Sequence, residues 1–148
     1  MFDLWDVGGL ERTRPLWRSY TRNTDLIFFV LDSADSERLD EAKLELQSVI
    51  KRTEKLSVPI IVIANKQDLP SAVPLEKISS QLGINKAGRS QPLSLKSSCG
   101  ITGEGLEDVF QEVKLTVQKN RQKARKFSEN PKPTIGGKMH RSISQHFL

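Results

Sequence analysis

The hydrophobic and polar positions of the chain follow two patterns, one typical of strands and one typical of helices. Two nearly continuous apolar runs, Leu26 to Leu31 and Pro59 to Ala64, are typical of strands covered on both faces. Phe2 to Val7 alternates apolar and polar residues, which predicts a shorter strand. Gln91 to Lys96 is a weaker strand candidate because Pro92 lies within it and cannot donate a hydrogen bond to a neighbour.

Helical periodicity lies between these strand candidates. The spacing predicts helices from Asp35 to Arg52, from Leu75 to Leu82, and from about Gly105 into a basic segment. Glu11 to Tyr20 has partial helical character, which Pro15 interrupts. Strands alternating with helices predict an α/β fold with a doubly wound, mostly parallel sheet. Ligands of such sheets bind beyond the carboxyl ends of the strands.

The end of the chain does not continue this alternation. Residues 127–148 contain prolines and paired glycines and show no periodicity, so a disordered tail is predicted there. Residues 1–126 are then expected to form the folded domain.

Composition narrows the class of protein. A chain of 148 residues, 36% hydrophobic and 28% charged, is ordinary for one soluble domain. Its longest apolar run, Leu26 to Leu31, is too short to span a bilayer, and no secretory signal follows Met1. Cys99 is the only cysteine, which excludes an intrachain disulfide. A reducing, cytosolic setting is one of the settings that fit.

The net charge of +5 is unevenly distributed. Between Lys114 and Lys126 there are six basic residues and no acidic one, which suggests an anionic partner for this segment. Anionic membrane lipid fits this pattern, and a solvated helix end explains it equally well. Nucleic acid is disfavoured because no aromatic residues are interleaved for base stacking, although a nuclear location stays open. The cations assigned to lipid are Lys119, Arg121, Lys123, Arg125 and Lys126.

The most specific motif is Asn65-Lys66-Gln67-Asp68, directly after a buried strand. A carboxylate at Asp68 can accept hydrogen bonds from the ring N–H and the exocyclic amine of guanine. Adenine offers neither of these two donors at the corresponding positions, so such a site would reject it. Asn65 would engage N7 of the base or fix the loop, and the stem of Lys66 would cover the base plane. A polar turn after a strand explains the four residues alone equally well.

A second polar loop, Ser98-Cys99-Gly100, follows the weaker strand candidate. Its backbone N–H groups would donate to the carbonyl oxygen of guanine. Considered alone, the loop is more typical of a turn before a helix, with Cys99 as a small buried hydrophobic residue.

A third motif, Asp6-Val7-Gly8-Gly9, ends the first strand candidate. Asp6 is the predicted Mg²⁺ ligand, through water, and Gly9 would let its backbone N–H approach a terminal phosphate. Considered alone, a Gly-Gly turn that ends a strand is the simpler interpretation.

Together these motifs resemble the ADP-ribosylation-factor and factor-like (Arf/Arl) family of small GTPases, over Phe2 to Lys126. The basic C-terminal segment resembles the subgroup with polybasic tails. The matching segments are Trp5 to Gly9, Arg14 to Tyr20, Asp32 to Asp35, Glu41 to Lys43, Ala64 to Pro70 and Thr102 to Leu106.

The resemblance implies a P-loop-NTPase-like fold, GTP or GDP with Mg²⁺ as ligands, and a nucleotide-dependent switch in membrane traffic or signalling. It implies a monomer that is cytoplasmic and peripherally associated with membranes. It also implies that Trp5 and Tyr20 belong to an exposed patch read by effector proteins, although core packing is the default role of such aromatics.

The chain departs from the family pattern in two respects. It contains no Gly-x-x-x-x-Gly-Lys-Ser/Thr loop, which would hold the phosphates and is expected upstream of Met1 together with a central strand. That strand would lie between the Phe2–Val7 and Leu26–Leu31 strands, so two unpaired strand edges and marginal stability are expected.

The second departure is Leu10, which stands where the family usually carries the glutamine that orients the attacking water. No catalytic residue is therefore assigned, and GTP hydrolysis is expected to be impaired. The alternative function is a non-catalytic module for binding effectors or membranes that has lost nucleotide control.

Overall fold

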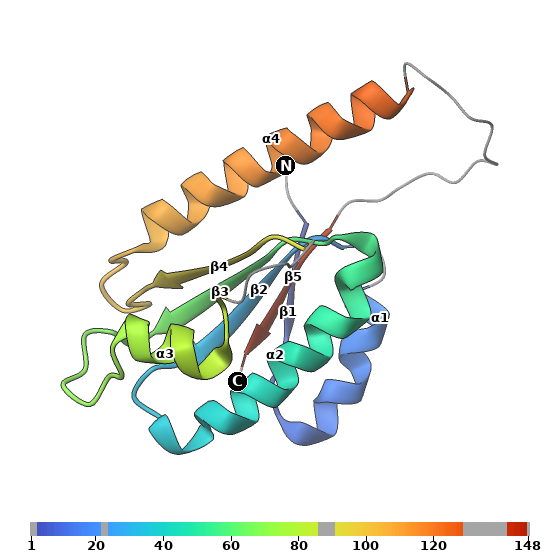
Figure 1. The fold of residues 1–148 in the computed structure, drawn as a ribbon. Coiled ribbons are helices and arrows are strands. Elements are labelled where there is room, and N and C mark those ends of the chain that lie inside the picture. Colours follow the sequence, from blue (N-terminus) through green and yellow to red (C-terminus); the bar gives the residue numbers. More distant parts are fainter. Residues whose placement is uncertain (1–2, 22–23, 86–90, 129–141, 148) are drawn as a thin grey trace.

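The computed structural model describes residues 3–21, 24–85, 91–128 and 142–147 (Figure 1). Within α4, side chains are described as far as Lys119, and for Gln122. The strands form one five-stranded sheet in the order β1-β5-β2-β3-β4, and every neighbouring pair is parallel. The strands are β1 (Asp3–Val7), β2 (Thr24–Asp32), β3 (Ile60–Asn65), β4 (Leu93–Ser97) and β5 (Ser142–Phe147).

The helices lie where the periodicity predicts them. The 3₁₀ helices are η1 (Glu11–Leu16), η2 (Ser36–Arg38) and η3 (Glu54–Leu56). The α-helices are α1 (Trp17–Thr21), α2 (Leu39–Thr53), α3 (Leu75–Leu82) and α4 (Leu106–Ser128). The predicted parallel α/β fold is confirmed. No helix among the described residues combines the length and the apolar composition needed to cross a membrane.

Helix boundaries follow local chemistry. The helix predicted from Asp35 begins with the η2 turn, because the Asp35 carboxylate accepts a hydrogen bond from the Arg38 N–H at 3.3 Å. Pro15 lies inside η1, where a short 3₁₀ turn tolerates it. Gly83 ends α3 in the left-handed region, with φ of 67°.

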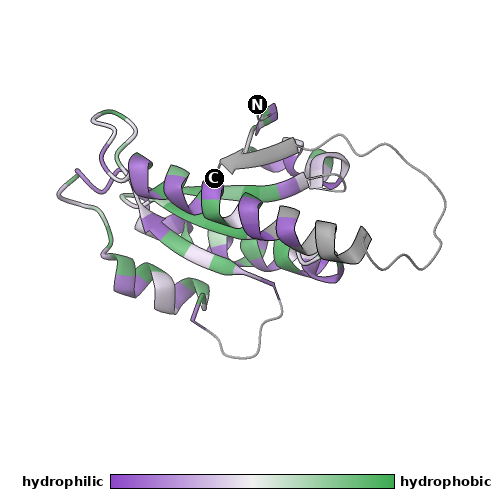
Figure 2. Ribbon diagram, turned by 90° about the horizontal axis from the view of Figure 1, so that it is seen from above, coloured by the Kyte–Doolittle hydropathy of each residue, from purple (hydrophilic) through white to green (hydrophobic). Residues whose placement is uncertain are grey.

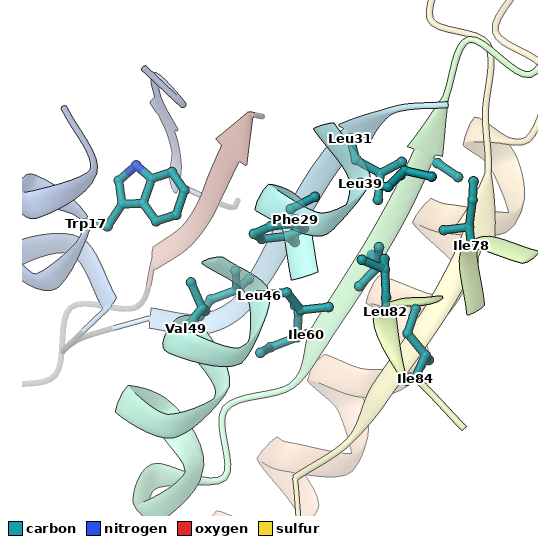
Figure 3. Packing of buried hydrophobic residues seen from close by; sticks show 14 of the residues in the cluster. Trp17, Phe29, Leu31, Leu39, Leu46, Val49, Ile60, Ile78, Leu82 and Ile84 are labelled. Carbon is teal, nitrogen blue, oxygen red and sulfur yellow. The ribbon is translucent and has the colours of Figure 1, made fainter. Parts of the chain in front are cut away.

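The sheet separates two hydrophobic clusters. The larger lies on the face covered by α1, α2 and α3, and Figure 3 shows Trp17, Phe29 and Leu46 within it. The smaller lies on the opposite face, where Val109 and Val113 of α4 pack on β2 and β3. In Figure 2 the central strands are largely apolar, whereas α4 alternates between polar and apolar residues. The continuous apolar runs of β2 and β3 are therefore covered by helices on both faces.

The C-terminal segment corrects two predictions. Ser142–Phe147, within the residues 127–148 expected to be disordered, forms strand β5 between β1 and β2, and α4 extends to Ser128. Residues 129–141 and 148 lie outside the described residues. The expected pair of unpaired strand edges is likewise not found, because β5 pairs with β1 on one side and with β2 on the other. The backbone N–H and C=O groups on those two edges require partners, and β5 supplies them.

Candidate guanine-nucleotide site

The carboxyl ends of β2, β3 and β4 lie side by side and carry the polar loops. Asp32, the last residue of β2, is level with Asn65, the last residue of β3, and Ala64 is level with Ser97 of β4. Beyond the strands, the Ser98 N–H donates to the Ala64 carbonyl at 2.9 Å. The topology therefore brings the Asn65–Asp68 loop and the Ser98–Gly100 loop together at one edge of the sheet.

Asn65 joins these two loops directly. Its Oδ1 accepts hydrogen bonds from Ser98 Oγ at 3.1 Å and from the Gly100 N–H at 2.9 Å. Of the two roles left open by the sequence, contact with N7 of guanine or fixing of the loop, this geometry corresponds to the second.

Lys66 is held by a residue that the sequence analysis did not assign to the site. Its Nζ lies 2.5 Å from Asp32 Oδ2, and its backbone is in the left-handed region with φ of 65°. Burial of Asp32 raises the pKa of its carboxyl. The hydrogen bonds from Lys66 and from the Ala34 N–H outweigh burial, so the pKa is lowered overall. The signal for Asp32 was its position at the end of an apolar strand, before Ser33.

Asp68 projects from a loop that is held on both sides. The Gln67 N–H donates to the Ser98 carbonyl at 3.2 Å, and the Leu69 N–H donates to the Lys66 carbonyl at 3.1 Å. Asp68 itself is exposed, and none of the ion pairs among the described residues involves it. Its carboxylate is therefore available as an acceptor beside the second loop.

The Ser98–Gly100 loop uses its own amides. The Cys99 N–H donates to the Glu104 carbonyl at 3.0 Å, while the Ser98 and Gly100 amides are bonded as described above. The role predicted for these amides, donation to the guanine carbonyl, therefore requires the Gly100 N–H to be shared between the base and Asn65. Cys99 is buried, as its interpretation as a small hydrophobic residue predicts. A hollow of about 60 Å³ is lined by Gln67, Ser97, Ser98, Cys99 and Glu104.

The Asp6–Leu10 segment lies away from these loops. β5 and β2 separate β1 from β3, which at about 4.8 Å per strand places Asp6 roughly 14 Å across the sheet from β3. Asp6 and Leu10 are exposed, and the carbonyl of Gly9 accepts a hydrogen bond from Arg14 Nε at 2.9 Å. The described residues contain no group of three side chains that could hold a metal. Asp6 alone offers one ligand, and magnesium would take the others from water and phosphate.

The two aromatic residues assigned to an effector patch contact each other. The ring centroids of Trp5 and Tyr20 are 5.7 Å apart and the rings are tilted by 48°. Trp5 is 50% exposed, whereas Tyr20 is partly buried against the larger hydrophobic cluster. The pair thus combines an exposed surface with core packing.

The parallel sheet flanked by helices, with polar loops at its carboxyl edge, is a P-loop-GTPase-like fold. The model of the ADP-ribosylation factor family matches residues 1–117, and the chain belongs to this family of small GTPases.

Several curated relatives are similar to the chain over most of its length. It is 43% identical to human ADP-ribosylation factor-like protein 4A over 124 residues, which are 84% of this chain and 62% of that protein. It is 44% identical to human ADP-ribosylation factor-like protein 4C over 117 residues, 79% of this chain and 61% of the relative. For human ADP-ribosylation factor-like protein 4D the identity is 38%, over 84% of this chain and 62% of the relative. The chain thus spans less than two thirds of the length of these relatives.

Proposed function

We propose that this protein binds guanine nucleotides, with Asp68 selecting the base and Asn65 holding the two base loops together. The observation that carries the proposal is the pair of hydrogen bonds from Ser98 and Gly100 to Asn65. These bonds fix the second loop beside the exposed Asp68 carboxylate. Two donors of guanine aimed at one carboxylate would favour guanine over adenine. The protein would then act as a switch in membrane traffic or signalling, and the bound GTP or GDP with Mg²⁺ would set its state.

Binding of fluorescent GDP and GTP analogues in the presence of Mg²⁺ tests this proposal. We expect saturable binding in the micromolar range, and Asp68→Asn is expected to weaken it at least tenfold. Hydrogen bonds to a charged group contribute about 1.5–3 kcal/mol. Asp108→Asn is the matched control, because it removes the same charge from an exposed position at the start of α4. Equal affinities of the Asp68 and Asp108 variants would contradict the assignment of Asp68, and absence of binding by a folded chain would contradict nucleotide binding.

We further propose that hydrolysis of bound GTP is impaired because Leu10 offers no group to orient water. Asp6 would contribute to the Mg²⁺ shell and the Gly9 amide would approach the terminal phosphate. A chain extended at its N-terminus by the phosphate loop of a curated relative allows the test. In this extended protein, Leu10→Gln is expected to raise the single-turnover rate of GTP hydrolysis at least tenfold. A rate unchanged by Leu10→Gln would show that the leucine does not limit hydrolysis.

The second candidate function is a non-catalytic interaction module, and the exposed face of Trp5 against Tyr20 favours it. Leu10 and Leu16, later in the same segment, are exposed apolar residues as well. An effector protein that buries this surface would gain about 25 cal/mol per Å² of apolar area removed from water. Effector binding that persists when Asp68→Asn abolishes nucleotide binding would favour this module over the switch.

The basic end of α4 would add attraction to anionic lipid, at roughly 1 kcal/mol per cation near the surface. Of the five cations assigned to this role, the side chain of Lys119 is described and is exposed. We propose that the protein is a cytoplasmic monomer in peripheral contact with membranes.

A further inference from the structure

A groove lies between helix α4 and the beginning of strands β3 and β4. It has a volume of about 650 Å³, and its described lining comes from α4, from β4 and from the residues before the two strands, Pro59 and Pro92. Pro59 directly precedes β3 and Pro92 directly precedes β4, whereas the two base loops follow the carboxyl ends of these strands. The groove therefore reaches the edge of the sheet opposite to the candidate nucleotide site.

The charge along the groove differs between its two ends. Helix α4 runs back along the sheet from the carboxyl end of β4 (Figure 1), so its later turns lie near the amino ends of the strands. Toward the base loops, Lys96 is neutralised by Glu112, with Nζ and Oε2 3.1 Å apart, and Asp108 adds a negative charge. At the other end Lys119 is exposed, and none of the ion pairs among the described residues uses it. Positive charge thus predominates where the groove meets the amino ends of β3 and β4.

The segment that leads into β3 adds cations and an apolar side chain at this edge. Residues 51–57 contain three basic residues and one acidic residue, Glu54. Lys51 and Lys55 are exposed and take part in none of the ion pairs within the described part of the chain. Leu56 is 59% exposed, and it ends η3 three residues before Pro59 of the groove. Two segments that are distant in the sequence, η3 and α4, therefore present exposed cations at one edge of the sheet.

An exposed leucine accompanies the cations in each of the two segments. Leu115 of α4 is 56% exposed and lines the groove, and Leu56 is its counterpart in η3. Leucines flanked by lysines are typical of surfaces that lie in a membrane interface, where the leucines enter the acyl chains and the ammonium groups stay with the phosphates. Nucleic acid fits less well, because among the described residues neither the groove lining nor residues 51–57 include an aromatic side chain for base stacking.

We propose that the η3–α4 surface, made of Lys51, Lys55, Leu56, Leu115 and Lys119, docks on membranes that contain anionic phospholipid. The inference rests on the proposed attraction of α4 to anionic lipid, and it adds a second segment, η3, together with an orientation. Because the surface lies at the edge opposite to the base loops, docking leaves the candidate nucleotide site facing away from the membrane. Two contacts on one rigid surface also hold a protein on a membrane more firmly than one basic cluster does.

Sedimentation of the full chain with vesicles of phosphatidylcholine and phosphatidylserine tests the surface, and vesicles of phosphatidylcholine alone measure the uncharged background. We expect Lys55→Glu to lower the partition coefficient at least about fivefold, because it reverses one charge at the membrane surface. Leu56→Ser is expected to lower it about threefold, because less apolar area leaves water on docking. Lys77→Glu is the matched control, since it makes the same charge change at an exposed position in the first turn of α3. It should stay within about twofold of wild type.

A variant of the basic segment, Arg121→Glu with Lys123→Glu, separates this inference from the lipid role already proposed for α4. If this variant weakens vesicle binding while Lys55→Glu and Leu56→Ser do not, the η3–α4 surface is overturned and the role of α4 stands. If none of them weakens binding, or wild type does not bind, both proposals are contradicted. An equal loss for Lys77→Glu would show a response to net charge alone and would overturn the surface. A loss of DNA binding by Lys55→Glu, with vesicle binding unchanged, would assign the surface to nucleic acid instead.

Discussion

Replacing Arg14 with alanine is expected to lower the free energy of unfolding by about 2–3 kcal/mol, because it leaves Glu45 without this cation, and Glu41 with Arg38 alone, in a partly buried site. Arg14 is buried in η1, and its guanidinium contacts Glu41 and, at 3.1 Å, Glu45 of α2. Its Nε also donates to the Gly9 carbonyl at 2.9 Å. The Arg14 side chain thus connects the Gly8–Gly9 turn to helix α2, which covers the sheet. Equilibrium unfolding in urea measures the loss.

The matched control is Arg38→Ala. Arg38 contacts the same Glu41 carboxylate, at 2.9 Å, but its side chain is half exposed. Exposed ion pairs contribute about 0.2–1 kcal/mol, so this variant should lose less than about 1 kcal/mol. Similar losses for the two variants would show that burial of Arg14 does not determine its contribution.

The effect of Arg14→Ala should also depend on pH. Hydrogen bonds from Arg38 and then Arg14 lower the pKa of the Glu41 carboxyl below its ordinary value of 4.5. A carboxyl whose pKa is lowered by folding stabilises the native state above its unfolded pKa, and this contribution disappears as the pH falls through the folded pKa. The difference in stability between wild type and Arg14→Ala should therefore be largest near neutral pH and narrow below about pH 4.

The sequence predicts the core of this fold because a continuous apolar run indicates a strand that is buried on both faces. Leu26 to Leu31 and Pro59 to Ala64 lie at the centre of the sheet, with helices packed on both faces. Helical spacing identifies α2 and α3 for the same reason, since their apolar residues share one face. In these elements local pattern and tertiary environment agree.

Strand β5 could not be predicted in this way. Ser142–Phe147 follows a stretch with Pro131, Pro133 and paired glycines, and only Ile143 and Phe147 interrupt its polar residues. Its structure depends on two strand edges more than a hundred residues away in the chain, which a local pattern does not contain. The one indication was that the family resemblance left an interior position of the sheet without a strand, between Phe2–Val7 and Leu26–Leu31.

The candidate site was predicted in its residue types but not in its internal bonds. The motifs place Asn65, Lys66, Asp68 and the Ser98–Gly100 loop at neighbouring strand ends, and the structure brings them together. The sequence does not show that Asp32 holds Lys66, nor that the amides of the second loop are already bonded. Such pairings depend on side-chain positions that follow from the complete fold.

Gly105→Ala is expected to be about as damaging as the loss of Arg14, at about 3 kcal/mol, because it combines backbone strain with a collision. Gly105 adopts φ of 77°, and a Cβ there would lie 2.2 Å from the carbonyl oxygen of Ser97. Ser97 ends β4, and the next residue bonds Asn65, so the displacement would reach the second base loop. The variant should lose both stability in urea and affinity for guanine nucleotides.

Gly103→Ala provides the comparison that isolates the collision. Gly103 has a similar φ of 82°, but no atom lies within 4 Å of a Cβ built there. This variant should therefore lose only the cost of the left-handed backbone, about 1 kcal/mol, and keep its nucleotide affinity within about twofold. If both variants lost the same stability, backbone conformation alone would explain the two glycines. A larger loss for Gly105→Ala would show that the close approach of α4 to the end of β4 maintains the geometry of the loop.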